Sequence, residues 1–139
     1  MYLIAALDDR NGMLFNHRRQ SQDRVLREKI LELAGKSRLW MNGYSRKQFA
    51  SENISGIHTA EDFLAQAGEE DYCFVEDQAV SPFKERIKEL YLFKWNRKYP
   101  GDFFFDLDVT EGCWKLIRTE EFAGSSHEKI TLEVYRHEN

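Results

Sequence analysis

Short apolar runs that alternate with helical patterns constrain the fold of this chain most. Residues 2–7, 38–41, 72–75 and 90–95 are short and mostly apolar, which is typical of strands buried on both faces of a sheet. Segments with helical periodicity or capping signals lie between them, at residues 22–34, 44–50 and 59–68. Strands that alternate with helices predict an α/β fold of three layers, α-β-α, around a mostly parallel central sheet.

The longest predicted helix has clear boundary signals. Ser21 is the expected N-cap, and Gly35 is the expected stop. Further along, residues 54–57 form a brief predicted strand, and Ser81-Pro82 is a good start for a helix over residues 83–87. Residues 114–122 and 129–136 follow one another with no helix between them, so they are predicted to form an antiparallel C-terminal hairpin.

Composition indicates one domain over residues 1–139, with no repeat, low-complexity segment or linker. The formal net charge of −4 argues against a general nucleic-acid or membrane-surface binder. Asp8 and Asp9 interrupt the first apolar run, so we expect neither a signal peptide nor a membrane span.

Cys73 and Cys113 form no CxxC, which favours free thiols and a cytoplasmic location. The four histidines lack metal-ligand spacing, so no metal site is predicted.

Four segments along the chain, residues 3–6 (LIAA), 11–13 (NGM), 90–106 and 126–134, resemble the dihydrofolate reductase family. Residues 3–6 (LIAA) are similar to that family's first strand, and residues 11–13 (NGM) to the start of its mobile active-site loop. Residues 90–106 resemble a later strand, the Gly-Asp loop after it and the next short strand, while the last residues resemble the final hairpin. The resemblance spans nearly the whole chain and implies a dihydrofolate reductase-like fold. It also implies a region near residues 49–57 that is shorter than in the family and lacks a strand.

The family's cofactor contacts are altered. A Gly-Gly pair lets bare backbone approach the NADPH phosphates in the family, whereas this chain has Val75, Glu76 and Asp77 at that place. At about 5 Å and an effective dielectric near 20, each carboxylate–phosphate pair costs about 3 kcal/mol. The family's Gly-Arg-x-Thr turn becomes residues 42–45 (NGYS), without the arginine. No cofactor is therefore predicted, and NADPH bound in the family's manner is disfavoured.

The folate contacts are altered as well. Asp23 matches the family's catalytic carboxylate once a one-residue gap is allowed, but the apolar positions that grip the pterin become Arg24 and Arg27. Phe93 stands where the family has the threonine that assists the acid. The resemblance therefore implies that dihydrofolate reductase activity is lost.

Residues 16–24 (NHRRQSQDR) are the most unusual segment and lead into a helix N-terminus. Such an end binds anions through free backbone N–H groups, and arginine adds bidentate recognition of phosphate or carboxylate. The alternative is a solvated loop whose arginines pair with acids elsewhere. The first interpretation predicts an anionic small-molecule site formed by Asn16, Arg18, Arg19, Gln20, Ser21, Arg24 and Arg27.

Residues 124–129 (GSSHEK) are the second candidate segment. In the family, the turn of the last hairpin touches the mobile loop, and Asp102 matches another residue that does so. The resemblance therefore implies that His127, Glu128 and Lys129 lie beside the arginine loop and complete the site. If the chain is an enzyme, Asp23 and His127 are the expected proton-transfer residues. A plain polar hairpin turn is the alternative.

The leading hypothesis is a dihydrofolate reductase-like protein with a repurposed basic cleft that binds an anionic ligand. An NADPH-dependent reductase of another substrate is a second hypothesis. A non-catalytic interaction module or homodimer, using residues 103–105 with Trp95, is a third. The aromatic and basic residues of 93–99 would suit RNA binding or a ribonuclease role, but their period of two fits a half-buried strand better.

Overall fold

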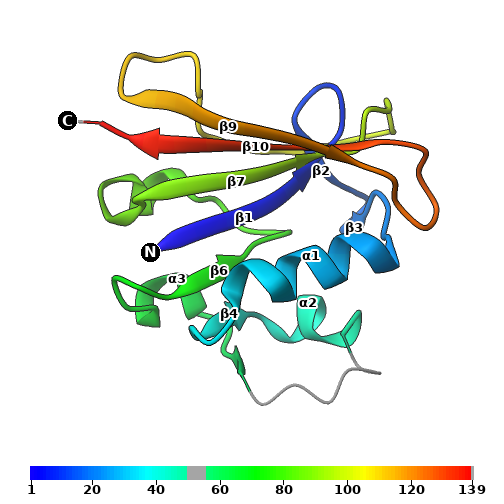
Figure 1. Cartoon of the computed structure of the whole chain (residues 1–139). Helices are drawn as coiled ribbons and strands as arrows, with labels where there is room; N and C mark the ends of the chain where they lie inside the picture. Colours follow the sequence, from blue (N-terminus) through cyan, green and yellow to red (C-terminus); the bar gives the residue numbers. More distant parts are fainter. Residues whose placement is uncertain (50–55, 139) are drawn as a thin grey trace.

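The computed structural model describes residues 1–49 and 56–138, and its centre is a seven-stranded sheet (Figure 1). The first five strands in spatial order run parallel, whereas β10 pairs antiparallel with both β7 and β9. The spatial order is β5 (Ile57–Thr59), β4 (Leu39–Met41), β6 (Tyr72–Phe74), β1 (Tyr2–Leu7), β7 (Glu89–Lys94), β10 (Ile130–His137) and β9 (Trp114–Phe122). The predicted parallel sheet and C-terminal antiparallel hairpin are confirmed.

Helices cover both faces of this sheet and complete the three layers. One face carries α1 (Arg24–Ala34) and α2 (Gly43–Lys47), with α1 lying across the sheet in Figure 1. The other carries α3 (Phe63–Gln66) and a 3-10 helix (Ser81–Arg86). Side chains alternate along β1 between two cores: Ile4 packs with the α1 residues Leu26 and Ile30, and Leu3 packs with the core that contains Phe63.

A small second sheet crosses the loop region and was not predicted. It consists of β3 (Arg18–Arg19), β2 (Gly12–Phe15) and β8 (Phe103–Phe104) in that order. Asn16 and His17 form the turn between β2 and β3, and both have positive φ, 51° and 62°. Two consecutive left-handed residues are the geometry of a tight hairpin turn, which Asn tolerates better than most residues.

Several predicted boundaries need correction. Ser21 does not cap α1, because Asp23 accepts hydrogen bonds from the first-turn N–H groups of Val25 and Leu26. The helix consequently begins at Arg24 and ends as expected at Gly35, whose φ is 55°.

The other differences are shifts of a few residues. The strand predicted at 54–57 is β5, Ile57–Thr59, although residues 50–55 lie outside the described part of the chain. The helix predicted over 59–68 contracts to α3, and the helix predicted after Ser81-Pro82 is the 3-10 helix Ser81–Arg86.

Candidate functional site

The candidate site lies where the parallel strands end. Asp8 follows β1, Asn42 follows β4, Glu76 comes soon after β6 and Trp95 follows β7. The carboxyl ends of parallel strands meet at one edge of a sheet, which is the usual location of ligand sites in α/β proteins. The segment from β2 to the start of α1 passes over this edge, since it contributes residues to the cavities described below.

An ion pair between Arg19 and Glu76 occupies the middle of this edge. The guanidinium is bidentate on the carboxylate, with Nε–Oε2 at 2.9 Å and Nη2–Oε1 at 3.1 Å. Ser45 Oγ also donates to Glu76 at 2.8 Å, and the Arg19 guanidinium lies 4.3 Å from the centre of the Tyr44 ring. Burial lowers the pKa of Arg19, but the hydrogen bonds and charge of Glu76 outweigh it and raise the pKa. Most of the charge of Arg19 is therefore already compensated within the protein.

Only a narrow space remains beside this ion pair. We call it the inner cavity; its volume is about 10 Å³, room for about one water molecule. Apolar side chains form part of its wall, and two buried polar atoms there, Gln20 Oε1 and Gln48 Nε2, have no hydrogen-bond partner among the described residues. Its lining is Ala6, Met13, Arg19, Gln20, Ser21, Leu26, Gln48, Phe74, Glu76 and Trp95.

Carboxylates gather on the α2 side of the same edge. Glu61 Oε2 accepts the N–H of Gly43 at 3.0 Å, so a carboxylate already occupies the start of α2. Asp77 accepts from Asn42 Nδ2 at 2.8 Å. Burial, followed by the nearby charges of Glu76 and Glu61, raises the pKa of Asp77. This side of the edge is therefore acidic, as the sequence at Glu76 and Asp77 indicated.

A dense hydrogen-bonded cluster joins the start of α1 to the final hairpin turn. Asp23 accepts the backbone N–H groups of Ser125 and Ser126 at 3.0 and 2.8 Å, in addition to those of its own helix. His127 Nδ1 lies 3.0 Å from Asp23 Oδ2. Burial raises the pKa of Asp23, but the hydrogen bonds from His127 and the backbone outweigh it, and the pKa is well below its usual range. Asp23 is therefore a carboxylate that holds two segments together.

The other nitrogen of His127 faces two hydroxyl groups. Ser21 Oγ and Tyr99 Oη each lie 3.0 Å from Nε2. The ring stacks on Trp95, with centroids 4.5 Å apart and planes 27° from parallel. The His127 and Asp23 side chains are 3% and 0% exposed. The imidazole is thus fixed in position and orientation by contacts on every side.

Loop-to-loop contacts agree with the resemblance. The backbone N–H of Asn16 donates to Asp102 Oδ2 at 3.1 Å, as implied for Asp102. Ser126 Oγ donates to the carbonyl of Gln22 at 3.0 Å, which connects the hairpin turn to the mobile-loop segment.

Four predicted ligand residues meet in a second, open space, which we call the outer pocket. It has a volume of about 570 Å³. Asn16, Arg18, Arg19 and Gln20 contribute to it, and its described lining includes no acidic side chain. Arg18 is exposed and forms no ion pair among the described residues. The lining consists of Phe15, Asn16, Arg18, Arg19, Gln20, Tyr99 and Pro100.

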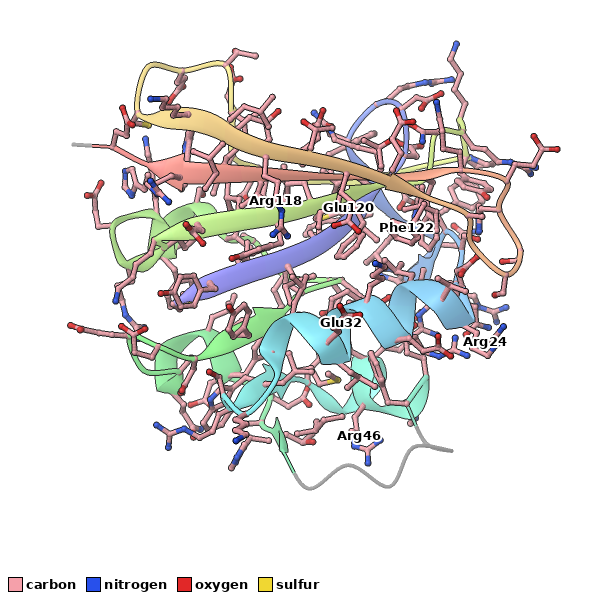
Figure 2. The ribbon with its side chains drawn as sticks, in the orientation of Figure 1. Arg24, Glu32, Arg46, Arg118, Glu120 and Phe122 are labelled. Atoms are coloured by element: carbon pink, nitrogen blue, oxygen red, sulfur yellow. The ribbon has the colours of Figure 1, made fainter. Side chains whose placement is uncertain are left out.

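The remaining predicted ligand residues lie outside this pocket. Arg24 is exposed at the start of α1, where Figure 2 labels it, and pairs with Glu28 at 2.7 Å. Arg27 is half-buried on α1, with Nε lacking a partner among the described residues. Lys129 pairs with Glu121 at 3.7 Å, and Glu128 is exposed. Ser21 lines the inner cavity instead.

Sequence reasoning missed Tyr99, Glu61 and Gln48. Tyr99 contacts His127 and the outer pocket, and Glu61 contacts Gly43 from 18 positions away. Local patterns contain no signal for such contacts, because only the folded chain brings these residues to the site.

Comparisons with known proteins identify the fold. No family model and no curated protein matches the sequence. Among solved structures, the dihydrofolate reductase of Enterococcus faecalis, in complex with NADP(H) and RAB-propyl, superposes with a TM-score of 0.72 at 12% identity. The match covers 99% of this chain and 96% of that one. The chain has a dihydrofolate reductase-like fold.

The described residues of this dihydrofolate reductase-like chain contain neither a membrane-spanning helix nor a cluster of metal ligands. None of its described helices combines the length and apolar character required to cross a bilayer. The described side chains include no group of three or more His, Cys, Asp or Glu residues arranged to hold a metal ion.

Proposed function

We propose that this dihydrofolate reductase-like chain does not reduce dihydrofolate and instead binds a small phosphate- or carboxylate-bearing ligand in the outer pocket. The observation that carries the proposal is the pocket itself. Asn16, Arg18 and Gln20 line a space of about 570 Å³ together with Tyr99, and its described lining contains no acid. Arg18 supplies a guanidinium without a protein partner among the described residues, which suits an oxyanion.

The acidic side of the strand edge supports the loss of NADPH binding. Glu76 and Asp77 stand where the resemblance places the family's Gly-Gly pair, and Glu61 occupies the N-terminus of α2. A cofactor phosphate would have to approach three carboxylates, one of them already using the helix N–H group that would hold an anion.

The ion pair at the centre of the edge supports the loss of folate binding. Arg19 and Glu76 hold each other, with the inner cavity reduced to about 10 Å³. A pterin ring needs far more room and an apolar slot. In addition, Asp23 is bound by the hairpin turn and by its own helix, so it is not a free carboxylate for a pterin.

Calorimetric titration of the whole chain with inorganic pyrophosphate and, separately, with citrate tests the proposal. We expect saturable binding of at least one probe, weakened about tenfold or more by Arg18→Ala, since a charge-assisted hydrogen bond contributes about 1.5–3 kcal/mol. Arg24→Ala is the matched control, because Arg24 is an exposed arginine outside the pocket. No binding of either probe, or equal weakening by both substitutions, would contradict the proposed function.

A further inference from the structure

The buried contacts of His127 have the connectivity of a nucleophile relay. Asp23 Oδ2 lies 3.0 Å from Nδ1, and Ser21 Oγ lies 3.0 Å from Nε2. When Nδ1 carries the proton, it donates a hydrogen bond to the Asp23 carboxylate. Nε2 is then free of a proton and can accept a hydrogen bond from a hydroxyl. A carboxylate, an imidazole and a serine hydroxyl in this order are the arrangement that activates serine, on whatever fold it occurs.

The residues around Asp23 and His127 hold both side chains in fixed orientations. Asp23 is held ionised by backbone N–H groups of two segments, and the imidazole is stacked on Trp95. Because both side chains are almost fully buried, the imidazole cannot rotate away from either partner without breaking the cluster. Rigid orientation of the base is what efficient proton transfer requires.

Ser21 is the only member of the relay with appreciable exposed surface; the inner cavity beside it has room for a single oxygen atom, so the rest of an ester must lie on the solvent side of Ser21. It is half-buried and lines the inner cavity, whereas His127 and Asp23 are enclosed. Gln48 lines the same cavity, and its Nε2 is buried without a hydrogen-bond partner among the described residues. An unpaired buried donor beside a candidate nucleophile is a group that a carbonyl oxygen can satisfy.

We propose that Ser21, His127 and Asp23 form an acyl-transfer site for short carboxylic esters, an activity separate from anion binding in the outer pocket. Ser21 Oγ forms a bond to the ester carbonyl carbon while its proton moves to His127 Nε2. The bond from that carbon to the alcohol oxygen then breaks, and the imidazolium returns the proton to the departing alcohol. Water hydrolyses the acyl-serine in the same way, so the products are a carboxylic acid and an alcohol.

The roles of the three residues differ. Ser21 is the nucleophile, and His127 transfers the proton. Asp23 is a positioning residue that holds the tautomer and stabilises the imidazolium. Tyr99 Oη contacts the same Nε2 from the side of the outer pocket and keeps the ring in place from that direction.

A fluorophosphonate probe tests the assignment on the whole chain. Attack by Ser21 forms a P–O bond and expels fluoride, which leaves a covalent adduct that intact-mass spectrometry detects and peptide mapping locates. We expect one adduct, on Ser21, that is lost in Ser21→Ala and at least tenfold slower in His127→Ala. Imidazole in the buffer should restore part of the His127→Ala rate, which a purely structural role would not predict.

Two variants separate chemistry from folding. Asp23→Asn keeps a side chain able to cap α1 but removes the charge, so labelling should slow while the circular dichroism spectrum stays native. His17→Ala removes an exposed imidazole outside the relay and should change neither labelling nor the hydrolysis of p-nitrophenyl acetate. No adduct on the folded protein, or an adduct on Tyr99 or Ser126 in place of Ser21, would overturn the proposal. Absence of pyrophosphate and citrate binding would leave this labelling result unaffected.

Discussion

The two sides of the strand edge contrast in how their charges are arranged. On the hairpin side, one carboxylate, Asp23, receives N–H groups from α1 and from the turn after β9, and His127 completes the cluster. On the α2 side, Glu61, Glu76 and Asp77 lie close together, and among the described residues only Arg19 forms an ion pair with one of them, Glu76. The first side joins segments of the fold, whereas the second gathers negative charge.

This contrast separates the loop contacts that agree with the resemblance from the strand-end residues that differ from it. The segment between β2 and α1 contacts the loop before β8 at Asn16–Asp102 and the turn of the last hairpin at Gln22–Ser126. The places where the family holds its cofactor and pterin carry other chemistry. Glu76 and Asp77 lie just beyond the end of β6, outside the two hydrophobic cores, where the fold tolerates different side chains.

Removing Asp23 should produce the largest effect of any single change on the hairpin side. Asp23→Ala deletes the N-cap of α1 and leaves the part-buried N–H groups of Ser125 and Ser126 and the buried His127 ring without their acceptor. We expect the free energy of unfolding to fall by about 4 kcal/mol, the sum of a lost cap and buried unsatisfied donors. Urea denaturation at pH 7 measures it, with exposed Gln22→Ala as the control. A loss below about 1 kcal/mol would mean that the cluster does not join the two segments.

Breaking the ion pair on the α2 side should have a smaller effect. Glu76→Ala leaves the half-buried Arg19 guanidinium and the Ser45 hydroxyl without their acceptor, and we expect a loss of about 2–3 kcal/mol. Replacing both partners, Arg19→Met with Glu76→Leu, should cost less than Glu76→Ala alone, because no charge is then left unpaired. Additive losses in a double-mutant cycle would show that the two side chains act independently.

Gly124 permits the close approach of the hairpin to Asp23. A Cβ at this position would collide with Asp23 Oδ2 and would lie 2.9 Å from Ile130 Cδ1. Gly124→Ala should therefore destabilise the protein by about 1–2 kcal/mol through overpacking. Gly112→Ala is the matched control, since an added Cβ there meets nothing within 4 Å. Equal thermal midpoints for the two variants would contradict the packing described for the cluster.

The low pKa of Asp23 predicts a pH dependence of stability. Its pKa in the folded state lies below the value of about 3.9 expected when unfolded, so its contribution is present above that pH and decreases as pH falls below it. The stability difference between the native chain and Asp23→Asn should therefore be constant from pH 7 to 5 and shrink by about 1 kcal/mol towards pH 3. Urea titrations at each pH measure it; a difference that grows on acidification would have the wrong sign.

Much of the fold was predictable because buried strands and the final hairpin leave local patterns. The strand-only ending and the apolar runs at β1, β6 and β7 each correspond to an observed strand. The N-cap was mistaken because Ser21 and Asp23 are both good caps, and only the folded chain shows that Asp23 accepts the first-turn N–H groups while Ser21 contacts His127. The small sheet escaped prediction because β3 has two residues and depends on a turn at Asn16 and His17.

The site was predictable only in part. Asn16, Arg18, Arg19 and Gln20 do gather in one pocket, as the unusual composition of their loop indicated. The partner of Arg19 was not foreseen, because Glu76 is 57 positions away and its pairing depends on the loop crossing the strand edge. Glu76, which we expected to repel a cofactor phosphate, thus also neutralises Arg19, which we expected to bind a ligand.

Titration of the whole chain with NADPH tests the central claim, that this dihydrofolate reductase-like fold has exchanged cofactor binding for other chemistry. Trp95 lines the inner cavity at the strand edge and reports on it through its fluorescence. We expect no saturable change up to millimolar NADPH and no oxidation of NADPH when dihydrofolate is added. Saturable binding at micromolar concentration, with hydride transfer to dihydrofolate, would contradict the account.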